Sequence, residues 1–183
     1  MAKGDDVVEV LASVAAYGGQ LAAVFHNYSL TAKRIPRGSE GAINILDATV
    51  ATLKQVSKLF TDDVDHGKNL FSQQGVEYAR LLAVECGTAF AGIEPIMEEA
   101  YLDPRERRAL RRKRKSKPEL VVPAPDPMKL RLDEKKFLET VERAIWSRAF
   151  LDIEKCTERL HDLQLHLLLV FQVVTVHALS KDV

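Results

Sequence analysis

The sequence predicts an all-α fold: a helical bundle of four to six helices with a long, largely buried C-terminal helix. Apolar residues recur at spacings of three, four and seven through most of the 183 residues, which places them on one face of successive helices. Clusters of Gly, Pro, Asp and Ser separate the segments that carry this pattern. There is no alternating strand pattern and no hairpin dipeptide, and the chain has the size of a single helical domain, 1–183.

The first helical block is predicted over residues 5–102 and contains three apolar stripes. Asp5 and Asp6 stand where a helix start favours acidic side chains. Ser39 follows the break "TAKRIPRGSEG" as a cap for the second helix, which ends in the run "TDDVDHGKN". Pro95 is expected to bend or interrupt the third helix, because proline removes an amide donor and crowds the preceding turn. The stripes are Val7, Leu11, Val14, Leu21, Val24 and Tyr28; Ile43, Leu46, Val50, Leu53 and Phe60; and Phe71, Tyr78, Leu82, Ala89 and Ile93.

A basic, proline-rich insert, predicted to be flexible, occupies residues 104–128 between the two helical blocks. Residues 101–117 carry 9 basic and 2 acidic side chains, whereas residues 1–100 carry 8 and 13 and residues 118–183 carry 9 and 11. The basic part is compatible with a helix, since Arg, Lys, Ala and Leu are good helix formers. The proline part that follows should be an exposed, extended connector.

The second helical block is predicted over residues 129–180, with Asp133 as its cap and a break near Ser147. Its last stretch, "LQLHLLLVFQVVTVHAL", has no charged residue unless a histidine protonates. This stretch is shorter than the ~20 apolar residues that cross a bilayer, and five polar side chains are distributed through it. We therefore expect a central core helix rather than a membrane span. The predicted faces are Phe137, Val141 and Ile145, and then Ala149, Ile153, Cys156, Leu160, Leu163, Leu167, Val170 and Val174.

No residue pattern predicts a metal site or a catalytic site. His161 and His166 are five residues apart, which turns them away from each other on a helix. The paired carboxylates Glu98–Glu99 and Asp62–Asp63 fall at turns or helix ends and are expected to be solvated. We therefore expect no enzyme, no cofactor, no metal and no small-molecule substrate. The histidines are His26, His66, His161, His166 and His177.

The cysteines and the paired glycines are interpreted as structural residues. Cys86 and Cys156 fit no metal-ligand spacing, so we expect reduced thiols packed in the core of a cytosolic protein. Gly18 and Gly19 lie in "AAYGGQLAA", which lacks the GxGxxG and GxxxxGK[ST] patterns of nucleotide-binding loops. Close helix packing or a kink is predicted there instead.

Two segments are candidates for contact with other molecules. The basic cluster around "RRKRK" has the composition of a nuclear import signal, of an anion-binding patch, or of a solvated loop that maintains solubility. No aromatic residue interleaves with it, so base stacking is not indicated and nucleic acid is the least favoured partner. The N-terminal helix has a single charge, Glu9, between Val7 and Phe25, which suits entry into a bilayer. The cluster comprises Arg105, Arg107, Arg108, Arg111, Arg112, Lys113, Arg114, Lys115 and Lys117; the candidate membrane helix presents Val7, Val8, Leu11, Val14, Leu21, Val24 and Phe25.

The hydrophobic pattern resembles that of a known family. The run "VVEVLASVAAYGGQLAAVFHNYSL", followed by a Pro/Gly break and a second helix, is similar to the N-terminal helical domain of fungal STAND (NLR-like) proteins, as is the final block, where Trp146 precedes "ERLHDLQLHLLLVFQVVTV". The resemblance covers residues 5–100 and 130–180. It implies an all-α, non-enzymatic module of the fungal cytoplasm that precedes a nucleotide-binding domain and relays or executes a signal. The distantly related HeLo-like domains kill cells by exposing an N-terminal apolar helix to membranes.

The chain departs from that family in having no P-loop, no repeats and no amyloid-type tail within these residues. We therefore expect either a domain taken from a longer protein or a free-standing relative.

Three functions are open at this point. The first is a non-enzymatic signalling or scaffold domain that acts through protein partners or self-association. The second is a HeLo-like executor that targets membranes with its N-terminal helix, with the cationic cluster meeting anionic lipid. The third is a nuclear or polyanion-binding protein that uses the basic cluster. The expected location is the cytoplasm, since there is no secretory signal pattern, with Arg111–Lys115 as a candidate nuclear signal.

Overall fold

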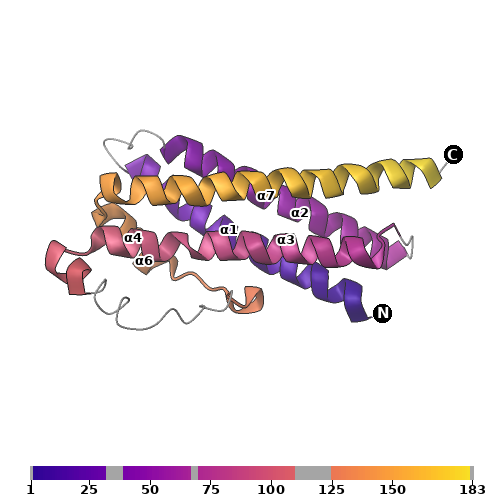
Figure 1. Ribbon diagram of the computed structural model, residues 1–183, viewed down its shortest axis with the longest axis horizontal. Coiled ribbons are helices and arrows are strands. Elements are labelled where there is room, and N and C mark those ends of the chain that lie inside the picture. Colours follow the sequence, from indigo (N-terminus) through magenta and orange to yellow (C-terminus); the bar gives the residue numbers. More distant parts are fainter. Residues whose placement is uncertain (1, 32–38, 67–69, 110–124, 182–183) are drawn as a thin grey trace.

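The computed structural model (Figure 1) describes residues 2–31, 39–66, 70–109 and 125–181. These residues are almost entirely helical and contain no strand, which confirms the all-α bundle and its long C-terminal helix. Residues 104–109 are also helical. The elements are α1 (Ala2–Thr31), α2 (Ser39–His66), α3 (Gln73–Ala91), α4 (Ile93–Tyr101), the 3₁₀ turn η1 (Pro127–Lys129), α6 (Glu134–Arg143) and α7 (Trp146–Lys181).

The central helix of the bundle is α1. It crosses obliquely between the other helices (Figure 1) and packs against α2, α3, α6 and η1. The predicted stripe on α1 is buried, with Tyr28 partly so, and Val10, Tyr17 and Phe25 are buried on its other faces. The faces of α1 that these elements cover are apolar, as burial requires, and its remaining side is exposed and carries the single charge of Val7–Phe25, Glu9, together with alanines.

The C-terminal helix α7 forms a wall of the bundle rather than its centre. The predicted inner row from Ala149 to Val174 does face the core, with Cys156 and Val170 partly buried. Among the described side chains of α7, the buried residues belong to that row or, like Thr157, lie beside it, and the outer side of the leucine-rich half is open to solvent. The expectation that this helix is buried nearly all round is therefore corrected, because α1 already occupies the central position.

Close packing of α1 depends on one member of the glycine pair. A Cβ atom at Gly18 would lie 2.6 Å from Cε2 of Phe90 and 2.9 Å from Cγ2 of Val50. A Cβ atom at Gly19 would meet only Val50, at 4.0 Å. The structure thus places the predicted close helix contact at Gly18, where α2 and α3 both approach α1.

Helix boundaries follow the expected signals. The third apolar segment is divided at Gly92, so α3 ends at Ala91, the residue whose carbonyl the ring of Pro95 would crowd in a continuous helix. Asp133 caps α6 by accepting a hydrogen bond from the amide of Lys136 at 3.1 Å. The break between α6 and α7 comes at residues 144–145, slightly before the position expected from Ser147.

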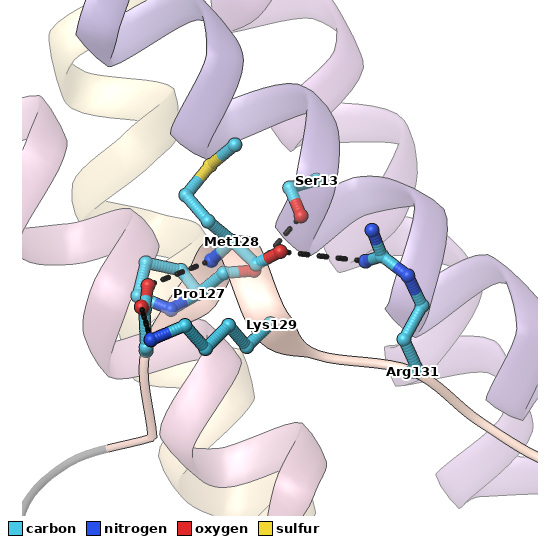
Figure 2. Close-up of polar contacts among 6 residues, drawn as sticks. Ser13, Pro127, Met128, Lys129 and Arg131 are labelled. Atoms are coloured by element: carbon cyan, nitrogen blue, oxygen red, sulfur yellow. Dashed lines mark hydrogen bonds and ion pairs between the residues drawn. The ribbon is translucent and has the colours of Figure 1, made fainter.

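The two described ends of the basic, proline-rich insert are ordered against the bundle. Residues 104–109 are helical, and η1 forms one short turn in which Asp126 accepts a hydrogen bond from the amide of Met128 at 3.1 Å. The hydroxyl of Ser13 on α1 donates to the carbonyl of Pro127 at 2.8 Å (Figure 2). The expected extended connector is therefore a docked turn at this end, and residues 110–124 lie outside the described part of the chain.

Two predicted core residues are in fact exposed. Tyr78, on α3, is 41% exposed, and Ile145, in the break before α7, is 44% exposed. In both cases helical spacing alone assigned the residue to the wrong face. For Ile145 the helix stops before the residue is reached. For Tyr78 the reason is that α3 presents a second apolar face, described below.

Candidate protein-interaction surface

An uncharged apolar row runs along the solvent side of α7. Its members, spaced by four, four and three residues, lie on one face of the helix, and we call this row the outer stripe. Single exposed apolar residues are ordinary on a protein surface, but a contiguous row of them marks an interaction site. The outer stripe consists of Leu165 (51% exposed), Leu169 (55%), Val173 (61%) and Val176 (66%).

The solvent face of α7 changes character along its length. In the first half it carries charged residues, among them Glu154, Glu158 and Asp162, and at Leu165 it turns apolar. A helix that needed only to remain soluble would stay polar on this face to its end. The switch therefore makes the second half of α7 a candidate interaction surface.

The apolar surface continues from α7 onto α3. A groove with a volume of about 280 Å³ lies between the two helices and is walled by Leu169 and Val173 on one side and by Tyr78 on the other. Its floor includes Phe71, which stacks on Phe60 with ring centroids 3.7 Å apart. Leu81, one turn beyond Tyr78 on α3, is 53% exposed. The outer stripe and this groove thus form one apolar surface made by two helices.

The structure describes three members of the predicted basic cluster. Arg105 and Arg108 are exposed, but Arg107 is half-buried and its guanidinium lies 3.7 Å from the carboxylate of Glu99. The remaining members, Arg111, Arg112, Lys113, Arg114, Lys115 and Lys117, lie outside the described residues. Their proposed role in nuclear import or polyanion binding stays a prediction.

The candidate membrane helix is the core of the bundle. Of its predicted apolar residues only Val8 is half-buried, and the others are at most 4% exposed. Among the described residues, the helix that is long and apolar enough to cross a membrane is α1, over Asp6–Leu30, by length and composition alone. A buried core helix passes the same test, and 56% of that window is buried in the bundle.

The histidines of the described chain do not converge on a metal site. His26 contacts Asp47 at 2.8 Å on the surface, and His66 bonds to the backbone carbonyl of Asp62 at 2.8 Å. His161 and His166 are exposed, and the side chain of His177 lies outside the described part. Within the described residues no group of three or more His, Cys, Asp and Glu side chains is placed to hold a metal ion.

The predicted carboxylate pairs have structural partners. Asp63 accepts a hydrogen bond from the amide of Leu70 at 2.8 Å, which links α2 to the segment that precedes α3. Glu98 lies 3.8 Å from the ammonium of Lys136, so it links α4 to α6.

One buried polar contact ties α1 to α4. The hydroxyl of Tyr17 donates a hydrogen bond to the carboxylate of Glu94. Burial, reinforced by this bond and by the charge of Glu94, raises the pKa of Tyr17 above its ordinary value. The phenol therefore remains a neutral donor, which suits a structural role.

The raised pKa of the Cys86 thiol predicts how the stability of the fold changes at alkaline pH. Burial, with a smaller contribution from Glu85, raises this pKa from 9.0 to about 12. Above pH 9 the unfolded chain loses a proton that the folded protein keeps, so the free energy of unfolding falls between pH 9 and pH 12, by up to ~1.4 kcal/mol per pH unit. Urea unfolding at a series of pH values should show a shallower decline for Cys86→Ala than for the wild type. Equal slopes would contradict the assignment.

Comparison with known proteins adds no relative. No protein-family model, no curated protein and no solved structure matches the chain.

Sequence reasoning missed the outer stripe, although a signal for it was present. The stretch after Leu163 is apolar on both faces, and a bundle of this size can cover only one face of a wall helix. Reading the outer face alone, from Glu158 through Leu165 to Val176, shows the change from charged to apolar. On α3, Tyr78 and Leu81 are likewise large apolar residues on an outer face.

Proposed function

We propose that this chain is a non-enzymatic helical signalling or scaffold domain that works through protein contacts, as its resemblance to the N-terminal domains of fungal STAND proteins implies. The observation that carries the proposal is the outer stripe of α7, continuous with the apolar groove beside α3. In this proposal the bundle stays folded and binds its partner through its surface. Burying a half-exposed row of Leu and Val against another protein supplies the driving force for association.

The first contact to test is one between two copies of the chain. The outer stripe is uncharged and regularly spaced, so two copies related by a two-fold axis can pack stripe against stripe without bringing like charges together. Gln172, within the same stretch, is exposed and offers a polar group that would fix the register of such a pair.

Replacing Leu169 and Val173 by Lys should abolish association. Sedimentation velocity over a range of concentrations should show a concentration-dependent dimer for the wild type and a monomer for Leu169→Lys/Val173→Lys. Both side chains are more than half exposed, so the circular dichroism of the variant, and its unfolding midpoint at low protein concentration, should match those of the wild type. Asn44→Lys/Gln55→Lys, at exposed positions on α2, adds the same two charges elsewhere and should dimerise normally. A wild type that stays monomeric and also captures no partner protein would overturn the proposal.

One observation favours a second candidate, the membrane-targeting executor: α1 has the length and composition of a membrane-spanning helix. The free-energy cost of removing α1 from the bundle opposes this function. Withdrawing α1 exposes the buried residues Val7, Leu11, Val14, Leu21, Val24 and Phe25 and the core that they fill. At about 1.5–3 kcal/mol for each side chain, this cost is comparable with the whole stability of a typical domain, ~5–15 kcal/mol. Membrane entry by α1 would therefore require the bundle to unfold.

A further inference from the structure

A second groove lies on the other side of α7, between that helix and the start of α2. Its volume is about 320 Å³, and its wall on α7 is formed by Trp146, Phe150 and residues further along the same face. Gly41 and Ile45 form the wall on α2. The lining residues of α7 extend from Trp146 to Glu158, which corresponds to ~18 Å along a helix axis. The groove is therefore elongated, in the way that suits a peptide segment more than a compact ligand.

The wall of the groove is held rigidly at its Trp146 end. The indole stacks on Tyr28 with ring centroids 5.2 Å apart and meets the ring of Phe25 edge-on at 5.8 Å. Its Nε1 donates a hydrogen bond to the carbonyl of Val141 at 3.3 Å. Because these contacts fix the indole in place, an incoming side chain finds a preformed apolar surface, which lowers the entropic cost of binding.

The rim of the groove is acidic, and its carboxylates are free of partners within the described chain. Glu154 and Glu158 are exposed on α7 and line the groove, one helical turn apart. The cations beside them in the sequence are turned to other partners: Lys155 pairs with Asp152 at 3.1 Å, and Arg159 with Glu85 at 3.5 Å. Among the described residues, the apolar groove therefore carries two negative charges along one edge that have no cationic partner.

We propose that this groove binds an amphipathic helix of a partner protein, one that inserts large apolar side chains against Trp146 and Phe150 and places Lys or Arg beside Glu154 and Glu158. Two carboxylates one turn apart match basic residues spaced by one turn on the partner, which sets both its register and its direction. The inference rests on the proposed function, since it assumes a domain that works through protein contacts. It uses a surface separate from the outer stripe.

The test uses a designed peptide and the fluorescence of Trp146, which is the only tryptophan in the sequence. The probe is a capped helical peptide of about 16 residues, with leucines on one face and lysines flanking them, and its counterpart has every lysine replaced by glutamate. Titrating the leucine–lysine peptide into the whole chain should shift the emission of Trp146 saturably. The leucine–glutamate peptide should produce no shift at the same concentrations.

Two variants locate the site. Glu154→Gln/Glu158→Gln should weaken binding of the leucine–lysine peptide roughly tenfold, whereas Glu139→Gln/Glu142→Gln, which removes two exposed carboxylates from α6, should leave it unchanged. Gly41→Leu should block binding without unfolding the bundle, because a Cβ atom at Gly41 meets nothing within 4 Å. The outer-stripe variant Leu169→Lys/Val173→Lys should bind the peptide as the wild type does.

Three results would overturn the inference: no binding of the leucine–lysine peptide, equal binding of both peptides, or unchanged binding by Glu154→Gln/Glu158→Gln. None of these results touches the proposed function, which depends on association through the outer stripe. Conversely, a wild type that forms no dimer and captures no partner protein, but still binds the peptide, would remove the stripe proposal and leave the groove. The two conclusions can therefore fail separately.

Discussion

Gly18→Val is expected to destabilise the bundle by about 3 kcal/mol. The new Cβ atom would lie 2.6 Å from the ring of Phe90 and 2.9 Å from Val50, and both neighbours are buried with little room to move. The branched side chain would therefore push α1 away from α2 and α3 at the centre of the core. Urea unfolding followed by circular dichroism should show the loss as a lower midpoint with an unchanged slope.

The neighbouring glycine supplies the control for this prediction. Gly18→Ala introduces the same close contact through its Cβ atom, so it should destabilise the protein despite the better helix propensity of alanine. Gly19→Ala meets its nearest neighbour at 4.0 Å and should stabilise the protein by up to ~1 kcal/mol. Opposite signs for two adjacent and identical substitutions would confirm the packing of α1. A stabilising Gly18→Ala would contradict it.

Leu11→Ala is expected to cost about 3 kcal/mol, because Leu11 is fully buried in the centre of the bundle and its removal leaves a cavity. Leu169→Ala, the same chemical change in the leucine-rich stretch of α7, should change stability by less than about 0.5 kcal/mol, since Leu169 is 55% exposed. The comparison tests which helix is central. It is best made at low protein concentration, so that association through the outer stripe does not contribute to the apparent stability of the wild type.

If α7 were the central helix instead, Leu169→Ala would cost at least as much as Leu11→Ala. A large loss for both variants would mean that the outer stripe is covered in the monomer, and the proposed interaction surface would not exist. A small loss for both would mean that neither position is tightly packed, which contradicts the burial of α1.

The fold class and most inner rows could be predicted from the sequence, because helical periodicity depends only on which residues must share a face. The rows on α1 and α2, from Val7 to Phe60, are buried as expected, apart from the partly buried Tyr28. Local signals also placed the cap at Asp133 and the interruption near Pro95, since each depends on the chemistry of one residue and its immediate neighbours.

The relative positions of the helices could not be predicted in the same way. α1 and the second half of α7 are both nearly free of charge, and composition alone does not say which is surrounded by partners and which displays one face to solvent. That choice depends on how many helices pack against each, a property of the whole fold. Similarly, nothing local to Pro127 reveals that its carbonyl accepts a hydrogen bond from Ser13, more than a hundred residues away in the chain.

The two candidate surfaces differ in the same respect: the sequence contains a pattern for one of them and none for the other. The outer stripe was present in the pattern from Glu158 to Val176 but was assigned to the core, because the helix was assumed to be central. The groove beside α2 could not be predicted at all. It requires Gly41 and Ile45 to lie opposite Trp146 and Phe150, and only the tertiary structure brings these residues together.

Hydrogen–deuterium exchange, followed by mass spectrometry at low and high protein concentration and then with anionic liposomes, tests the central claim most directly. The claim is that the folded bundle acts through the surface of α7. It predicts that peptides covering residues 165–176 become more protected as the concentration rises, and that α1 remains among the most protected segments under every condition. Loss of protection in α1 on adding liposomes, with no change over residues 165–176, would contradict the account and support membrane entry by the N-terminal helix.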